Sequence, residues 1–125
     1  MKPKLTTLAL LALVALTMTA RQAQPQSPKY AQGVPMCGHV AWRNDYADVV
    51  NSCNSEVTIA WTSRGSCFGT AIDLASGAHR GTGCSQKDLG GGELEIFTCP
   101  GDSTPVDRNG RPIYQHYSGE YACHY

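Results

Sequence analysis

The chain has 125 residues, six cysteines and a formal net charge of zero, with ten basic and ten acidic residues. Lys and Arg do not cluster anywhere along it, so it lacks the basic surface with which proteins bind phosphate backbones. Nucleic acid is therefore not predicted as a partner, and a length of this order fits a single small domain.

The first twenty residues have the layout of a secretory signal peptide. Lys2 and Lys4 precede an uncharged apolar run over residues 5–18, and the run ends in the small residues Thr19 and Ala20. A transmembrane helix needs about 20 predominantly apolar residues, whereas this run is shorter. We therefore predict that residues 1–20 are removed, and that the mature chain is secreted, either extracellular or periplasmic, without a membrane anchor. Its eight basic and ten acidic residues leave it fairly polar, with a modest core.

Six cysteines follow the signal segment, and an even number of cysteines in a short exported chain predicts three disulfides. A zinc site is the alternative, but structural zinc ligands come in close pairs such as C-x-x-C, which are absent here. Six cysteines allow 15 pairings. We predict the sequential one, because each pair brackets turn-forming sequence, and each closed loop would add about 3 kcal/mol of stability. The predicted pairs are Cys37 with Cys53, Cys67 with Cys84, and Cys99 with Cys123.

The mature chain divides into a flexible Gln/Pro-rich leader over residues 21–36 and a disulfide-stabilised β domain over residues 37–125. Short β-prone runs separated by Gly, Asn, Asp and Ser predict six or seven strands, and long amphipathic helices are absent. The fold class is therefore all-β, a small disulfide-stabilised antiparallel β-sandwich or open barrel. The predicted strands cover residues 38–42, 48–53, 57–62, 68–74, 93–99, 113–117 and 120–125.

Alternation is clearest in residues 57–62, where Val57, Ile59 and Trp61 predict one buried face. We expect this strand to form a hairpin with residues 48–53, and residues 113–117 to form one with residues 120–125. Turn residues also predict tight reversals over residues 43–45 and 107–110. The polar, glycine-rich stretch that ends at Cys84 predicts no strand, and a short helix remains the alternative there.

The stretch from Val49 to Trp61, with its Val-x-Asn-x-Cys motif and the Val-rich strand that follows, resembles the opening strands of thaumatin-like proteins and similar secreted β-sandwiches. The resemblance covers little more than a dozen residues. It implies a β-sandwich with a disulfide near its first hairpin. The cysteine number is far below that of a thaumatin-like domain, and the acidic cleft residues of that family have no matching motif here.

No ordered catalytic motif is present, and no catalytic, cofactor-binding or metal-binding residue is predicted. A small secreted His-dependent hydrolase, similar to a ribonuclease, is the alternative, with His39, Glu56, Arg80 and His116 as candidates of the required chemical types. His116 and His124 would face each other across the terminal hairpin, but no spacing arranges a metal site. Asp102, Asp107 and Asn109 offer oxygen ligands for calcium without its loop motif, which favours a turn.

Four tyrosines crowd the last twelve positions, and Tyr114, Tyr117 and Tyr121 are the candidate ligand-binding residues. Tyrosine is enriched where proteins recognise other molecules, because it combines a large apolar face with a hydroxyl group. The other interpretation is that these rings fill a small core. We predict a monomeric binding or interaction module for a protein or glycan. The further alternative is an inhibitor or toxin-like effector that inserts the loop over residues 102–112 into its target.

Overall fold

The computed structural model describes residues 30–32 and 37–125 of the chain. The predicted signal peptide and most of the predicted leader lie outside the described residues. The described part contains nine strands and one short 3-10 helix. In chain order they are β1 Tyr30–Gln32, β2 Gly38–Arg43, β3 Tyr46–Asn51, β4 Val57–Thr62, β5 Gly69–Leu74, β6 His79–Ser85, η1 Gln86–Leu89, β7 Glu95–Pro100, β8 Thr104–Val106 and β9 Ala122–His124.

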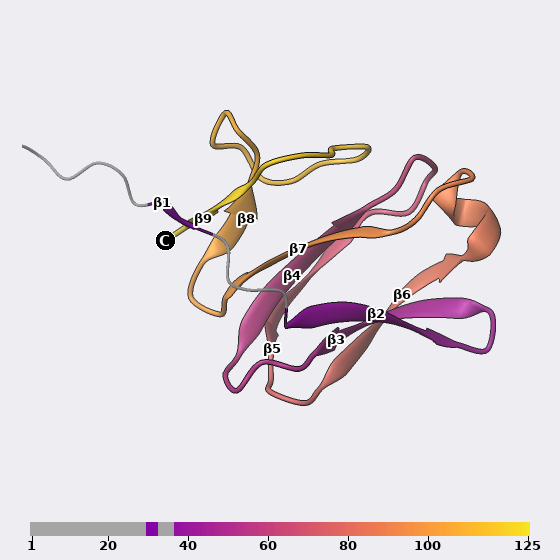
Figure 1. Cartoon of the computed structure of the whole chain (residues 1–125), viewed down its shortest axis with the longest axis horizontal. Helices are drawn as coiled ribbons and strands as arrows, with labels where there is room; N and C mark the ends of the chain where they lie inside the picture. Colours follow the sequence, from indigo (N-terminus) through magenta and orange to yellow (C-terminus); the bar gives the residue numbers. More distant parts are fainter. Residues whose placement is uncertain (1–29, 33–36) are drawn as a thin grey trace, which may run out of the picture.

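The strands form three sheets of three strands each, ordered β2-β3-β6, β5-β4-β7 and β1-β9-β8. All pairings between these strands are antiparallel. Figure 1 shows the β2-β3-β6 sheet on one side of strands β4 and β7, and strands β8 and β9 on the other side. The predicted fold class, a small disulfide-stabilised antiparallel β domain, is confirmed.

A hairpin of β2 and β3 begins the domain. The predicted turn over residues 43–45 is confirmed, and Asn44 takes a left-handed conformation with φ 56° that suits a tight reversal. The pairing runs from Arg43 opposite Tyr46 to Gly38 opposite Asn51. A disulfide closes the open end of the hairpin by joining Cys37 to Cys53.

The main hydrophobic core lies between the β2-β3-β6 and β5-β4-β7 sheets. Val57, Ile59 and Trp61 project into it from β4, as their alternation predicted. The Trp61 ring lies so close to Gly69 of β5 that a Cβ at residue 69 would come within 2.6 Å of it. The other members are Val49, Cys67, Ala71, Leu74, Cys84 and Leu89. Two facing layers with this shared core form a sandwich.

Strand β4 is buried on both faces, which corrects the expectation of a single buried face. All six of its residues are buried. Thr58, Ala60 and Thr62 face away from the main core, since side chains alternate along a strand. They are covered by the C-terminal part of the chain, which packs across β4 and β7.

The predicted hairpin between residues 48–53 and 57–62 is wrong, because β3 and β4 belong to different sheets. Strand β3 has both of its edges occupied, by β2 and by β6. Strand β6 was missed because its sequence has no apolar alternation, and Cys84 is its one buried residue. Asn51 links the two sheets, since its amide nitrogen donates to the carbonyl of Leu74 on β5 at 2.8 Å.

The predicted C-terminal hairpin is also wrong. Residues 113–117 form no strand, and β9 pairs instead with β8 on one side and β1 on the other. Strand β1 lies within the segment predicted as a flexible leader, so three residues of that segment belong to a sheet. Pairing with β9 gives this short segment backbone hydrogen bonds, although its sequence pattern does not predict a strand.

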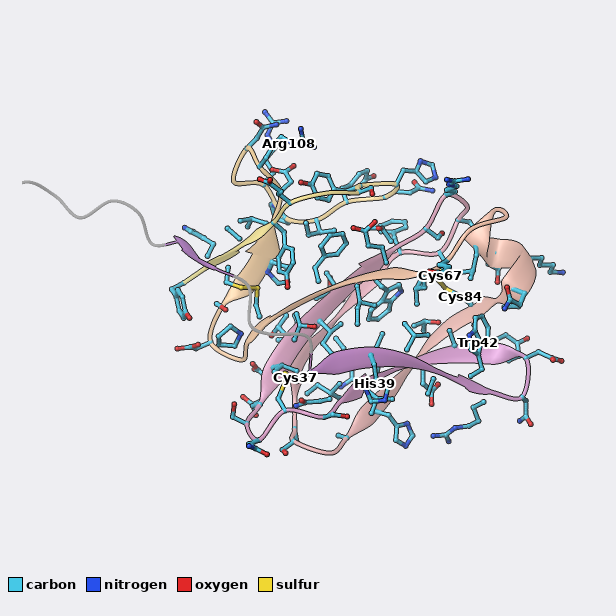
Figure 2. The ribbon with its side chains drawn as sticks, in the orientation of Figure 1. Cys37, His39, Trp42, Cys67, Cys84 and Arg108 are labelled. Carbon is cyan, nitrogen blue, oxygen red and sulfur yellow. A yellow bond between two sulfur atoms is a disulfide. The ribbon has the colours of Figure 1, made fainter. Side chains whose placement is uncertain are left out.

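The three disulfides have the predicted sequential pairing: Cys37–Cys53, Cys67–Cys84 and Cys99–Cys123. The pair Cys67 and Cys84, labelled in Figure 2, joins the loop between β4 and β5 to β6, and Cys99–Cys123 fastens β9 to β7. Three disulfides fit a domain that folds in an oxidising compartment. Among the described residues, no helix has the length and apolarity needed to cross a membrane.

Candidate functional site

A groove of about 840 Å³ lies where the C-terminal segment separates from strand β7. Its walls come from three parts of the chain. One is the end of β4 and the following loop, residues 62–64. The second is the glycine-containing loop and β7, residues 91–97. The third is the C-terminal segment, residues 116–119, with Tyr121.

Hydrogen bonds to the two neighbouring strands hold the C-terminal segment beside them. The Thr62 hydroxyl at the end of β4 donates to the carbonyl of Tyr117 at 2.6 Å. The Glu95 carboxylate on β7 accepts from the Ser118 hydroxyl at 2.8 Å and from the Gly119 N–H at 3.3 Å. This wall of the groove is therefore fixed by side chains that bond to a segment without regular secondary structure.

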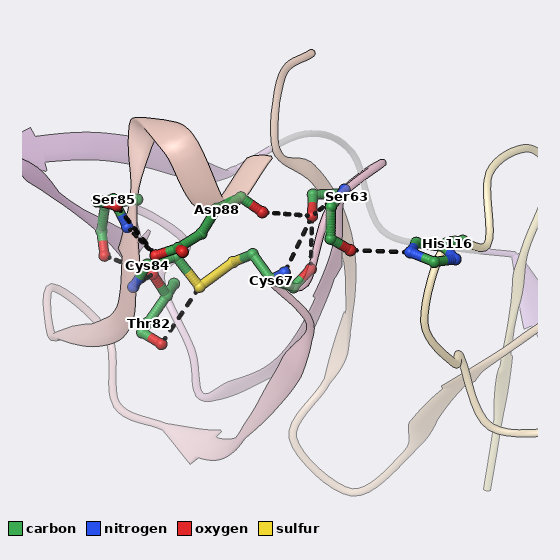
Figure 3. The surroundings of a disulfide bond; sticks show 9 residues. Ser63, Cys67, Thr82, Cys84, Ser85, Asp88 and His116 are labelled. Atoms are coloured by element: carbon green, nitrogen blue, oxygen red, sulfur yellow. Dashed lines mark hydrogen bonds between the residues drawn. A yellow bond between two sulfur atoms is a disulfide. The ribbon is translucent and has the colours of Figure 1, made fainter. Parts of the chain in front are cut away.

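The segment is also fastened to the loop that follows β4. The His116 ring nitrogen Nε2 lies 2.8 Å from the carbonyl oxygen of Gly65. That loop is ordered by the buried Ser63 hydroxyl, which donates to the Cys67 carbonyl at 2.9 Å and accepts from the Gly65 and Cys67 N–H groups at 3.2 Å (Figure 3). The Cys67–Cys84 disulfide anchors the same loop to β6.

Aromatic rings form the floor between the segment and β7. The Phe97 ring is buried and packs against Tyr117 and Tyr121, with ring centroids 5.7 Å and 5.2 Å apart. The Phe97–Tyr121 pair meets edge to face, a favourable geometry for aromatic rings. Burial raises the pKa of the Tyr121 phenol, while its hydrogen bond with the Thr98 backbone acts in the opposite direction.

The Tyr121 hydroxyl satisfies both backbone groups of one residue on β7. It accepts from the Thr98 N–H at 3.2 Å and donates to the Thr98 carbonyl at 3.0 Å. The Tyr117 hydroxyl likewise donates to the Glu120 carbonyl. Both hydroxyls therefore have structural partners, and the ring surfaces rather than the hydroxyls are what these tyrosines offer to a ligand.

The structure brings together two of the three candidate binding residues. Tyr117 and Tyr121 line the groove, but Tyr114 does not. The Tyr114 side chain is 69% exposed and contacts Phe68, with ring centroids 5.5 Å apart. Tyr117 and Tyr121 thus pack against Phe97 in a second small core and also border the groove, while their role in ligand binding stays a prediction.

The candidate hydrolase residues are not brought into one cluster. The exposed His39 on β2 lies 3.2 Å from the Ser52 hydroxyl, whereas His116 contacts Gly65 on the other side of the sandwich. Arg80 on β6 and Glu56, which lies against Gly101, are at two further places. The His-dependent hydrolase stays a prediction that the geometry of these four residues does not favour.

A charged cluster that the sequence did not reveal lies on the outer face of the β2-β3-β6 sheet. The Asp48 side chain on β3 is 10% exposed, and its Oδ2 lies 3.1 Å from Arg43 of β2 and 3.2 Å from the His79 ring of β6. It therefore links all three strands of the sheet. Within the described part of the chain, no group of three or more His, Cys, Asp or Glu side chains is placed to hold a metal ion.

The predicted reversal over residues 107–110 is confirmed and explains the Asp side chain there. Asp107 Oδ1 accepts from the N–H groups of Asn109 at 2.8 Å and Arg111 at 3.0 Å. These bonds hold the pKa of the Asp107 carboxyl below its usual value, the one from Arg111 having the largest effect. The turn projects at the edge of the domain in Figure 2, where Arg108 is labelled. Its insertion into a target stays a prediction.

Sequence reasoning missed the charged lining of the groove. Arg64, Glu93 and Glu95 belong to it, but the Arg64 region and the three glycines at 90–92 gave only the signal of a chain break or loop. No protein-family model matches the chain, and no curated protein or solved structure matches it significantly.

Proposed function

We propose that this chain is an exported binding module, and that the groove beside strand β7 takes its ligand, a protein or a glycan. The observation that carries the proposal is the groove itself. Its volume of about 840 Å³ lies within the range of roughly 300–1,000 Å³ that is common for ligand sites. Its lining combines aromatic and aliphatic side chains with about as much polar surface, so it is more polar than most such sites.

Two ionisable side chains of the groove, Glu95 and His116, are held by internal hydrogen bonds, which favours binding over catalysis. The Glu95 carboxylate accepts two hydrogen bonds from the C-terminal segment, and the His116 ring contacts a backbone carbonyl. A general acid or base must reach the reacting group of a substrate. Groups fixed in this way instead give a preorganised wall, and preorganisation favours affinity because less freedom is lost on binding.

Export is the other half of the proposal. Its support is the signal-peptide layout of residues 1–20 together with the three disulfides of the domain. Secretion can be tested by expressing the full chain with its own amino terminus and determining the first residue of the protein recovered outside the cytoplasm. We expect cleavage after Ala20, and retention of the intact chain inside the cell would contradict export.

The groove can be tested with a random peptide library and a glycan array, both screened against the disulfide-bonded protein. Tyr117→Ala removes one aromatic wall, and Glu93→Trp places a bulky ring at an exposed lining residue. We expect both changes to weaken binding of the selected ligands. Tyr46→Ala is the matched control, because Tyr46 is 54% exposed and does not line the groove. Ligands that bind both groove variants as well as the wild type would contradict the proposal.

A further inference from the structure

Among the strands that the structure describes, β7 lies at the edge of its sheet and pairs with β4 alone, in the order β5-β4-β7. In an antiparallel pair, successive residues point their N–H and C=O groups alternately toward the partner strand and away from it. The outer edge of β7 therefore offers hydrogen-bonding groups at every second residue. Unpaired groups of this kind are a template for another strand.

The hydrogen bonds of Tyr121 show which backbone groups of β7 point away from β4. Its hydroxyl bonds to both the N–H and the C=O of Thr98, so both of these groups face away from β4. The same alternation places the N–H and C=O of Ile96, two residues earlier, on the same outer edge. Ile96 lines the groove. The Tyr121 hydroxyl thus covers one outward pair, and the next pair lies where the C-terminal segment has separated from the strand.

The C-terminal segment forms the far wall of the groove without pairing with this edge. Glu95 holds Ser118 and Gly119, and Thr62 holds Tyr117, all through side chains rather than through backbone pairing with β7. The segment that runs beside the edge therefore does not use the outward groups of Ile96 to form a ladder. None of the described segments forms a ladder there, so a ladder would need a further strand.

We propose that the ligand of the groove is an extended peptide segment of another protein, which adds as a strand to β7 and pairs with the backbone of Ile96. This inference rests on the proposed function and names its ligand. Strand addition takes affinity from main-chain hydrogen bonds and selectivity from alternate side chains. The Tyr117 ring on one side and the Arg64 and Glu93 charges at the rim supply the contacts for those side chains. A glycan has no regular N–H and C=O pairs to match the edge, so the peptide fits the backbone chemistry better.

The test uses peptides selected from a random library on the disulfide-bonded protein. Ile96→Pro removes the outward N–H donor, and proline is tolerated on an edge strand where the lost N–H does not serve the ladder. We expect it to weaken peptide binding about tenfold, since a backbone hydrogen bond contributes about that factor. Ile96→Val keeps the N–H and should stay within about twofold of the wild type. Amide hydrogen exchange on the wild type gives a readout that does not depend on any variant, and the Ile96 amide should become protected when the peptide binds.

The outcomes separate this inference from the proposed function. Peptides that are weakened by Tyr117→Ala but leave the Ile96 amide unprotected would keep the groove and overturn strand addition. Glycans that bind the groove while no peptide does would also overturn it. Concentration-dependent dimerisation that Ile96→Pro abolishes would assign the edge to a second copy of the chain. If no groove variant changes the affinity for the selected ligands, both proposals are wrong.

Discussion

The two faces of strand β4 are both buried, but the chain covers them in different ways. Toward the β2-β3-β6 sheet, Val57, Ile59 and Trp61 pack into the main hydrophobic core between regular strands. Toward the C-terminal segment, β4 is covered by aromatic rings and by a chain that is held through side-chain hydrogen bonds. The second cover leaves a groove, because an irregular segment separates from the sheet where a paired strand would close it.

The largest effect should come from the aromatic cover. Replacing Phe97 by Ala removes a ring that is 1% exposed and packs against Tyr117 and Tyr121. We expect the free energy of unfolding to fall by about 3–5 kcal/mol, measured by chemical denaturation. Phe68→Ala is the control, since Phe68 is 42% exposed and should cost less than about 1 kcal/mol. Equal losses for the two variants would mean that the second face is not packed.

Removing the Cys99–Cys123 disulfide should loosen the C-terminal cover more than the sandwich. Both cysteines are fully buried, and the bond ties β9 to β7 across 24 residues of sequence. Replacing both by Ala should cost about 2–4 kcal/mol. Amide exchange should accelerate in β8 and β9, while β3 and β4 stay protected. Uniform acceleration along the whole domain would show that the two regions unfold as one unit.

Tyr121→Phe separates the ring of Tyr121 from its hydroxyl. The change leaves the Thr98 N–H and C=O without their side-chain partner, and we expect a loss of about 1–3 kcal/mol in the free energy of unfolding. Tyr114→Phe should change stability little, because that side chain is 69% exposed. If both tyrosine changes are neutral, the hydroxyl of Tyr121 does not hold the edge of β7.

The same residue gives a pH dependence with a definite sign. Burial raises the pKa of Tyr121 above its ordinary value of 10.0. A raised pKa in the folded state contributes stability that is fully present below pH 10 and is lost as the pH rises through the folded pKa. As the pH rises above about 10, the wild type should therefore lose more stability than Tyr121→Phe. A steeper loss in the variant would contradict this assignment.

The smallest effect concerns the turn over residues 107–110. The backbone N–H groups of Arg111 and Asn109 hold the pKa of Asp107 below its usual 3.8. The stability that this carboxylate gives to the turn is therefore present above about pH 3.8 and is lost as the pH falls through the folded pKa. An NMR titration should show the lowered pKa. Arg108→Ala removes a charge and keeps the hydrogen bonds, so it should raise the pKa of Asp107 only slightly. If the pKa of Asp107 returned to 3.8 in that variant, the nearby charge rather than the hydrogen bonds would lower it.

The sandwich could be predicted from the sequence to the extent that its strands carry alternation or cysteines. The strand Val57–Thr62 and the sequential disulfides are confirmed because local pattern and loop closure act over short distances. Strand β6 was missed because its residues are polar and glycine-rich, and its pairing with β3 depends on a partner some thirty residues earlier. Sheet membership of β3 and β4 is likewise a non-local property.

The groove could be predicted only in part. The crowding of tyrosines pointed to Tyr117 and Tyr121, but nothing in the sequence separated them from Tyr114. Glu95 and Arg64 could not be predicted as lining residues. Their role depends on the position of an irregular segment that follows more than twenty residues later in the sequence. Side-chain bonds to backbone, such as that of Thr62 to Tyr117, leave no periodic signal.

The central claim is that the irregular cover of β4 and β7 forms a ligand-binding groove. It is tested most directly by mapping NMR chemical shifts of the disulfide-bonded protein during titration with a peptide or glycan selected on it. We expect the shift changes to concentrate in residues 62–64, 91–97 and 116–121, while the outer face of the β2-β3-β6 sheet around Asp48 stays unchanged. Shift changes centred on Asp48, His79 and Arg43, with none in the groove residues, would contradict a ligand-binding groove.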